Sequence, residues 1–218
     1  MFKRTALAIA FLGFCAVAAP ASAEKVRYQL DPNHTVVLAS WNHFGFSNPV
    51  ANFGQVDGQL DYDAANPAAS GVRVALPLAG LDSFVPKFDE HLRSADFFDA
   101  AKYPTVVFQS TKTEAVGEGK LKVTGDLTIR DVTKPVVLDV TLNKAGVRQG
   151  RPAVGFDAST TIKRSEFGLG LYVPNVSDDV TLRISTEATV PKSDAEKKAD
   201  AEKAAAEKAA AEKGAEKK

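Results

Sequence analysis

Cysteine and histidine are both scarce in this chain of 218 residues. The one cysteine, Cys15, lies in an N-terminal stretch that we expect to be removed, so the mature chain would have no disulfide and no reactive thiol. The three histidines are His34, His43 and His91, and none of their spacings matches a zinc-binding motif. The sequence therefore predicts neither a disulfide-stapled fold nor a metal centre.

An excess of charge of one sign is also absent. The whole chain has 27 basic and 27 acidic residues, and residues 24–190 alone have 17 basic against 20 acidic. Nucleic-acid binding needs a surface rich in Lys and Arg to neutralise the phosphate backbone. We therefore exclude nucleic acid as an expected partner.

Long hydrophobic runs are missing except at the N-terminus. Lys3 and Arg4 precede the apolar stretch 6–19, and the small residues 21–23 follow it. This order is typical of a secretory signal peptide, here cleaved after Ala23, and the run is shorter than the ~18 residues of a membrane-spanning helix. We expect export to the periplasm and a mature chain without a transmembrane segment. The chain would thus comprise a signal peptide (1–23), a folded domain (24–190) and a charged tail (191–218).

The folded domain is rich in alternating apolar and polar residues. For example, Leu121, Val123, Leu127 and Ile129 alternate with polar residues in one stretch. A period of two predicts half-buried antiparallel strands. The expected strands are residues 26–30, 35–41, 52–62, 71–78, 105–115, 120–130, 136–144, 153–163 and 179–190.

Many short strands and few helices predict an all-β sandwich or barrel. We favour a closed antiparallel barrel of eight strands, which can hold one small ligand inside. Only residues 87–95 have the length and composition of a helix in this domain, with Asp82 or Ser83 as its cap. The tail repeats Ala, Glu and Lys every five residues without an apolar stripe, which predicts a solvated segment that is helical or disordered.

Aromatic residues are plentiful but unevenly placed, with thirteen phenylalanines and a single tryptophan. They could simply fill a core. Several, however, fall at expected strand ends and in loops, where the mouth of a barrel cavity would be lined. Our candidate contacts to an apolar chain are Trp41, Phe46, Phe53, Leu92, Phe97, Phe98, Phe108 and Phe167. Candidate contacts to its head group are His34, His43 and Arg164.

Catalysis has only weak support in the sequence. Ser165, His91 and Asp89 are the residue types of a hydrolytic triad, but no G-x-S-x-G turn surrounds the serine. We expect no catalytic residue. The alternatives are a hydrolase or metal-dependent enzyme that uses His91 and Ser165, and a stress-related structural protein.

Four segments, in this order, resemble the signature segments of YceI-like polyisoprenoid-binding proteins. They are "LDPNHTVVLASWNHFGFS", "FDEHLRSADFFDAAKYPTVVFQS", "VTGDLTIRDVTKPVVLDV" and "IKRSEFGLG". The resemblance covers residues 26–190 and implies an extended, lipocalin-like barrel in a secreted or periplasmic protein. It further implies that an apolar channel holds a polyisoprenoid, such as a quinone or its precursor, or another amphiphilic lipid. No additional cofactor is implied, and a homodimer is left open.

The second of these segments is interpreted as a lid over one end of the barrel. Asp89 and Arg93 are four residues apart, so on a helix they would form an ion pair on one face. Phe97 and Phe98 follow the expected helix and should project in different directions. We therefore expect at most one of these two rings to face the channel.

Overall fold

A computed structural model describes residues 25–215 of the chain, and the side chains of the tail up to Lys208. The predicted signal peptide lies outside the described residues. The strands are β1 (Val26–Leu30), β2 (Val36–His43), β3 (Val50–Phe53), β4 (Asp57–Tyr62), β5 (Gly71–Pro77), β6 (Leu81–Asp82), β7 (Thr105–Gly117), β8 (Lys120–Ile129), β9 (Val132–Arg148), β10 (Arg151–Lys163) and β11 (Val176–Thr189). The helices are α1 (Pro86–Arg93) and α2 (Asp194–Ala215), with 3-10 turns η1 (Pro32–His34), η2 (Pro67–Ala69), η3 (Leu78–Gly80) and η4 (Arg164–Phe167).

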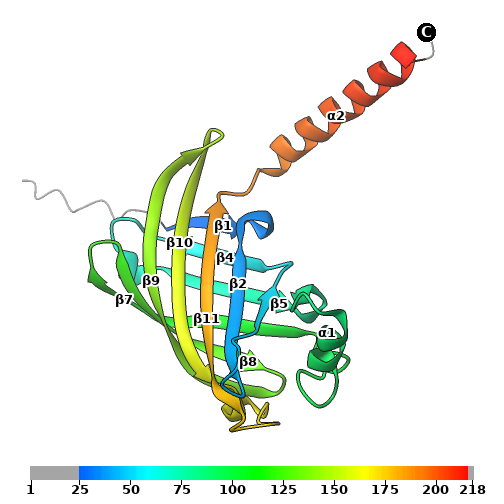
Figure 1. Cartoon of the computed structure of the whole chain (residues 1–218). Helices are drawn as coiled ribbons and strands as arrows, with labels where there is room; N and C mark the ends of the chain where they lie inside the picture. Colours follow the sequence, from blue (N-terminus) through cyan, green and yellow to red (C-terminus); the bar gives the residue numbers. More distant parts are fainter. Residues whose placement is uncertain (1–24, 216–218) are drawn as a thin grey trace, which may run out of the picture.

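Eight of these strands form a closed antiparallel barrel (Figure 1). They follow the order β1-β4-β5-β7-β8-β9-β10-β11, and β1 pairs with β11 to close the ring. The closing pairs are Gln29 with Thr189 and Leu30 with Ala188. The predicted eight-stranded barrel is confirmed.

The barrel is closed differently at its other end. There β11 pairs with β2, β2 with β3 and β3 with the two-residue strand β6, where the order of strands stops. Helix α1 follows β6 directly, before the chain returns to the sheet at β7 (Figure 1). Side chains of α1 line the barrel interior together with residues of β7 and β8. At this end, therefore, a helix stands where strand pairing would otherwise complete the wall.

The expected strand 52–62 is wrong, because the chain bends between β3 and β4. At the bend Gly54 donates its N–H to the carbonyl of Gly80 at 2.8 Å, and a Cβ on Gly80 would collide with the Gly54 carbonyl. Gln55 adopts a left-handed φ of 55°. The apolar positions change phase at this bend, from the odd-numbered Phe53 to the even-numbered Val56 and Tyr62, a signal that the expectation of one continuous strand did not take into account.

The expected helix is present but begins and ends two residues or fewer from the predicted limits. Pro86 occupies its first turn, where the missing N–H of proline is no loss. Neither Asp82 nor Ser83 is the cap, because the N-cap position is Val85 and it makes no side-chain capping bond. Inside the strands the alternation is confirmed: in β8, Leu121, Val123 and Leu127 are buried.

The tail forms helix α2, which leaves the end of the barrel where β11 finishes and points away from it (Figure 1). Ser193 and Glu196 cap its start reciprocally: the Ser193 N–H donates to Glu196 Oε2 at 2.7 Å, and the Glu196 N–H donates to Ser193 Oγ at 3.3 Å. The side chains from Asp194 to Lys208 are exposed. Within residues 25–215, no helix combines the length and the hydropathy needed to cross a bilayer.

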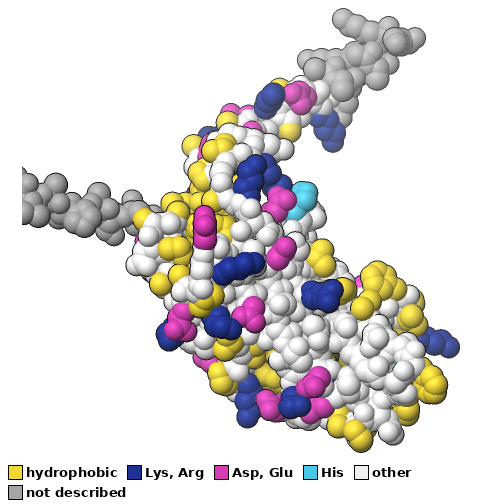
Figure 2. All heavy atoms as spheres, turned by 60° about the vertical axis from the view of Figure 1, so that its left-hand side comes forward, with side chains coloured by type: hydrophobic (Ala, Val, Ile, Leu, Met, Phe, Trp, Pro, Cys, Tyr) yellow, Lys and Arg dark blue, Asp and Glu magenta, His cyan; other side chains and the backbone are white. Residues whose placement is uncertain are grey.

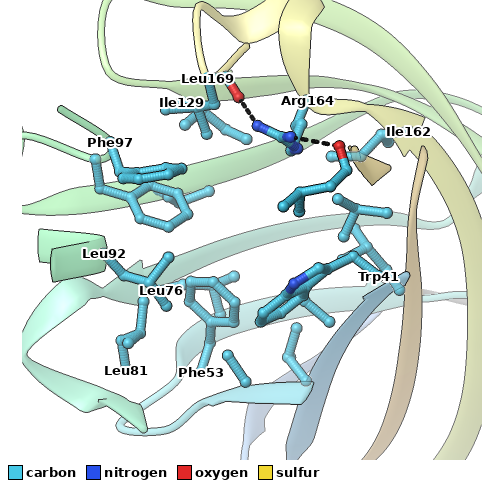
Figure 3. Close-up of a pocket in the computed structure, with 18 of the residues that line it drawn as sticks. Trp41, Phe53, Leu76, Leu81, Leu92, Phe97, Ile129, Ile162, Arg164 and Leu169 are labelled. Carbon is cyan, nitrogen blue, oxygen red and sulfur yellow. Dashed lines mark hydrogen bonds between the residues drawn. The ribbon is translucent and has the colours of Figure 1, made fainter. Parts of the chain in front are cut away.

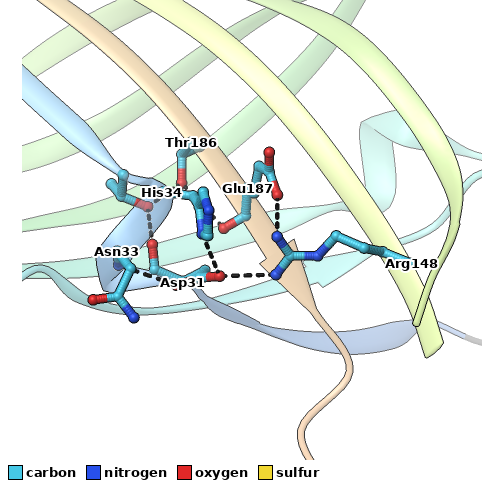
Figure 4. A network of polar contacts seen from close by, with 7 residues as sticks. Asp31, Asn33, His34, Arg148, Thr186 and Glu187 are labelled. Carbon is cyan, nitrogen blue, oxygen red and sulfur yellow. Dashed lines mark hydrogen bonds and ion pairs between the residues drawn. The ribbon is translucent and has the colours of Figure 1, made fainter. Parts of the chain in front are cut away.

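A polar network fastens the strand-closed end of the barrel (Figure 4). The carboxylate of Asp31 accepts hydrogen bonds from the Asn33 N–H at 3.0 Å and from Arg148 Nη2 at 2.8 Å, and its Oδ2 lies 2.8 Å from His34 Nδ1. Arg148 also donates through Nη1 to Glu187 at 2.7 Å. The network joins η1, the tip of β9 and β11. Hydrogen bonding by Arg148, more than any other contact, lowers the pKa of Asp31 to about 2.

We predict that Asp31→Asn lowers the Tm by about 2–4 °C at neutral pH, as expected for a loss near 1 kcal/mol in a domain of this size. The pKa of Asp31 in the folded chain lies below its usual value of 3.8. The ionised carboxylate therefore stabilises the fold above that value, and this contribution is lost as the pH falls toward about 2. Thermal melts of both proteins from neutral to acidic pH should show their Tm difference shrinking in this window. A difference that stays constant down to the lowest pH would contradict this role.

Candidate functional site

The barrel encloses two adjoining cavities, of about 330 Å³ and about 160 Å³. Val37, Leu76, Leu127 and Leu182 line both, so the two are successive chambers of one channel. We call the larger one, next to α1, the mouth chamber, and the smaller one the far chamber. The volume of the mouth chamber falls in the range of about 300–1,000 Å³ that is typical of small-molecule sites.

The mouth chamber is walled almost entirely by apolar side chains from α1 and the surrounding strands (Figure 3). Trp41 and Phe88 stack against each other with ring centroids 5.8 Å apart, which joins β2 to the lid helix. Ala39 and Ala51 pair across β2 and β3, and both line the chamber. Two alanines opposite each other leave more room than larger residues would, so they help to set the width of the channel.

The far chamber is also lined mainly by apolar side chains, and several hydroxyl groups lie among them. Thr35 Oγ1 lies 2.8 Å from Thr186 Oγ1, and Thr113 Oγ1 donates to the Ser70 carbonyl at 2.9 Å. These hydroxyls are thus already hydrogen-bonded within the protein. The chamber offers a surface suited to hydrocarbon.

Phe108 reaches the far chamber from β7 by lying across Gly125 of the neighbouring strand β8. A Cβ on Gly125 would collide with the ring of Phe108 and approach the Gln109 carbonyl. Phe108 is buried, with 8% of its surface exposed. Glycine is therefore required at this position for the ring to lie flat along the wall.

Arg164 is the one buried cation in the wall of the mouth chamber (Figure 3). Its Nε donates to the Ser177 carbonyl at 2.8 Å, and its Nη2 donates to the Val176 carbonyl at 2.8 Å. Its Nη1 donates to the carbonyls of Leu169 and Leu171. These bonds tie η4 to the loop that precedes β11 and fix that loop at the channel mouth.

The charge of Arg164 has no carboxylate partner within ion-pair distance among the described residues. Burial lowers its pKa below the usual value, and the more distant charge of Asp178 opposes that shift. An arginine still keeps its proton under such conditions. The mouth chamber therefore presents one positive charge beside an apolar surface.

The structure brings seven of the eleven candidate residues to the mouth chamber: Trp41, His43, Phe53, Leu92, Phe97, Phe98 and Arg164. Phe108 lines the far chamber instead. The other three lie outside both chambers. Phe46 is 91% exposed on the turn between β2 and β3, Phe167 is 1% exposed in the core beneath η4, and His34 belongs to the Asp31 network. Composition identifies aromatic residues but does not give the direction in which a loop side chain points.

Several lining residues were missed by the sequence reasoning. Inward-facing aliphatic residues such as Val37 and Leu182 could have been found, since the alternation identifies one face of each strand. Tyr172, in the loop fixed by Arg164, carries no such signal. His91 also lines the chamber, surrounded by the rings of Phe88, Phe97 and Tyr172.

The expectation that only one ring of the phenylalanine pair faces the channel is wrong, because both line the mouth chamber. A tight turn follows α1: the Phe98 N–H donates to the Leu92 carbonyl at 3.0 Å, and Asp99 has a left-handed φ of 48°. This turn, rather than a continued helix, orients the two rings. Phe98 packs edge-on against Phe53 at 5.9 Å, and Phe97 against His91 at 4.8 Å.

The expected ion pair between Asp89 and Arg93 is also wrong. The carboxylate of Asp89 accepts hydrogen bonds from the N–H and the hydroxyl of Ser83, at 2.7 Å and 2.5 Å. Arg93 donates to the carbonyls of Leu78, at 2.8 Å, and Leu81. The two charged groups thus attach α1 to the segment before it. Most of their partners there are backbone groups, and the sequence pattern does not show which backbone groups lie within reach.

The residues of the hydrolase alternative are not assembled into a triad. The hydroxyl of Ser165 donates to Asp178 at 2.7 Å, and Asp89 is occupied by Ser83. His91 contacts aromatic rings. In the described part of the chain, no group of three or more His, Cys, Asp or Glu side chains is arranged to hold a metal ion.

A closed antiparallel barrel of eight strands with an apolar channel is an architecture that can hold one small ligand in its interior. The chain belongs to the YceI-like domain family, which it matches over residues 28–188. Protein YceI of Escherichia coli O157:H7 is 35% identical over 191 residues, which are 87% of this chain and 100% of that protein. The family and the fold are of the binding-domain type.

Solved structures share the architecture. Burkholderia cenocepacia BcnA matches with a TM-score of 0.67 and 25% identity, over 72% of this chain and 98% of that one. A polyisoprenoid binding domain from Saccharophagus degradans, described as implicated in plant cell wall breakdown, matches with a TM-score of 0.61 over 77% of this chain and 100% of that one. Its identity is 14%, so this second likeness concerns the fold.

We predict that Phe97→Ala and Phe98→Ala have different effects. Phe98 packs on buried Phe53, so its truncation should cost up to about 3 kcal/mol of stability. Phe97 packs on His91 and the exposed Tyr172, so its truncation should cost less stability and mainly reduce ligand retention. Thermal melts and quantification of bound lipid on both variants test this. Equal losses of Tm with full lipid content in both would show that the assignment of these rings is wrong.

Proposed function

We propose that the protein binds a polyisoprenoid, such as a quinone or its precursor, or a similar amphiphilic lipid, without catalysis. The observation that carries this proposal is the apolar channel of two connected chambers with a buried cation at its mouth. A wall with few available hydrogen-bonding groups penalises polar solutes, because most of their lost hydration is not replaced. Two successive chambers suit a chain better than a compact ligand.

The head group is proposed to lie in the mouth chamber and the tail to extend toward the far chamber. Arg164, His43 and His91 all line the mouth chamber, whereas the hydroxyls of Thr35, Thr186 and Thr113 in the far chamber are bonded to one another or to backbone. An oxygen-rich or anionic head group beside Arg164 would supply the negative charge that the protein itself does not place there.

The cell compartment proposed for this activity is the periplasm, on the strength of the N-terminal signal sequence pattern. The ligand would be stored or carried between membranes there, since such a lipid does not cross water unaided. The polyisoprenoid binding reported for the Saccharophagus degradans domain supports this choice of ligand class.

We predict that Ala51→Leu strongly reduces the lipid content of the channel while the fold is kept. The added carbons would occupy space in the mouth chamber, whose wall includes Ala51. Displacing two methylene groups of a ligand, at about 0.8 kcal/mol each, should lower affinity about tenfold. The matched control is Ser159→Leu, which puts the same side chain on the exposed face of β10.

The measurement is native mass spectrometry of protein purified without detergent, followed by solvent extraction and identification of the lipid. Wild type and Ser159→Leu should carry the same lipid, and Ala51→Leu should carry about a tenth as much. An empty wild-type barrel that also refuses added isoprenoid would contradict the proposal. So would a lipid content that Ala51→Leu leaves unchanged.

A further inference from the structure

The exposed apolar residues of the protein are concentrated around the channel mouth. Phe46, at 91%, and Phe84, at 68%, are the most exposed aromatic side chains among the large hydrophobic ones. We define the mouth rim as Phe44, Phe46, Phe84, Val85, Leu171, Tyr172 and Val173. The exposed large hydrophobic residues elsewhere in the described chain are all single valines: Val26, Val36, Val116, Val137 and Val147.

The three segments of the mouth rim meet at the channel. The turn after β2 is joined to the loop before β11 because the Phe44 N–H donates to the Asn175 carbonyl at 2.8 Å. Tyr172 from that loop approaches His91 of α1, with ring centroids 6.4 Å apart. Phe84 and Val85 precede α1 directly. In Figure 2 apolar side chains lie along the lower right edge, at the end of the molecule that carries α1 in Figure 1.

Several of these aromatic residues have an unusual backbone conformation. Phe44, Phe84 and Tyr172 have left-handed φ angles of 54°, 65° and 68°. Such angles are uncommon for bulky residues, and glycine or asparagine normally occupies them. The other non-glycine residues with positive φ are polar: Gln55, Asp99, Arg130 and Gln149. Exposed aromatic residues in a strained conformation beside a cavity indicate a functional surface.

The mouth rim lacks charged residues, and this favours some kinds of partner over others. Residues 44–56, 83–86 and 167–177 contain no Asp, Glu, Lys or Arg. The rim thus offers aromatic and aliphatic side chains without a basic cluster, and the folded domain is slightly acidic. Adsorption through charge to an anionic surface is therefore disfavoured, whereas insertion of rings into the interface of a bilayer needs no charge.

We propose that the mouth rim docks on a lipid bilayer, with its aromatic residues inserted among the head groups and the channel opening toward the acyl chains. This inference rests on the proposed function, because a lipid that enters an apolar channel through an apolar rim never has to cross water. Helix α2 leaves from the other end of the barrel and does not obstruct this face (Figure 1). Docking is weak and reversible, as a few inserted side chains permit.

The test is flotation of the full mature chain with vesicles of pure phosphatidylcholine. The test variant is Phe46→Ser combined with Phe84→Asn, in which asparagine suits the left-handed backbone at position 84. The control is Val116→Ser combined with Val147→Ser, which removes exposed apolar residues away from the mouth. We expect wild type and control to float, and the test variant to bind about tenfold more weakly. Binding should persist at about 0.5 M salt, where exposed charges are largely screened.

Two further measurements separate the possible failures. Loading of each protein with polyprenol added from ethanol, in the absence of vesicles, tests the channel by itself. If the test variant loads normally and only its flotation is lost, the docking proposal is supported. If wild type loads polyprenol but does not float, docking is overturned and the lipid-binding function stands. If no protein loads polyprenol, the proposed function fails whatever the vesicles show.

A second copy of the chain is the rival occupant of the rim. Analytical ultracentrifugation of wild type and the test variant decides between them. A wild-type dimer that dissociates in the test variant would show that the rim is a dimer interface, and this would overturn docking on a bilayer. An unchanged oligomeric state in the two proteins supports docking.

Discussion

The replacement of strand pairing by a helix is the constraint on which the rest of the structure depends. A barrel needs every strand edge paired or covered. Unpaired backbone donors and acceptors cost free energy when they are buried, and they can pair with another chain when they are exposed. At one end the pairing of β1 with β11 satisfies this need. At the other end α1 covers the opening, held by Asp89 on Ser83 and by Arg93 on the carbonyls of Leu78 and Leu81. A helix can cover an opening while still leaving an entrance.

Arg164 has the corresponding role on the opposite lip of that entrance. Its bonds to four backbone carbonyls fix the loop that carries Leu171 and Tyr172. A buried charge thus positions a segment that has no regular secondary structure. The same charge lies in the chamber wall. Structural anchoring and the proposed contact with a head group are thus compatible in one side chain, because the carbonyl partners are neutral and leave its charge uncompensated.

Much of the fold could be predicted from the sequence, since alternation in stretches such as β8 reports burial directly. The interruption at Gly54 and Gln55 is marked in the sequence by a change of phase between Phe53 and Val56. The close approach of Gly80 to this bend could not be predicted, because Gly80 comes from a distant part of the chain. The candidate site was predicted where aromatic residues lie on strands, as Trp41, Phe53 and Phe108 do, and in the turn directly after α1, where Phe97 and Phe98 lie. Phe46, Phe167 and Tyr172 lie in turns and loops, whose side-chain directions are set by tertiary hydrogen bonds. Arg93 bonds to two backbone carbonyls, and Asp89 to the N–H and the hydroxyl of Ser83; backbone partners leave no mark in the sequence.

The most direct test of the central claim uses Trp41, the single tryptophan, which lines the mouth chamber. Isoprenoid analogues with a bromine either beside the head group or at the tail end would be titrated against its fluorescence. Quenching requires near contact between the bromine and the indole ring. We expect saturable quenching at one ligand per chain, stronger for bromine beside the head group than for bromine at the tail. Absence of quenching by either analogue, or stronger quenching by the tail bromine, would contradict a chain that lies in the channel with its head at the mouth.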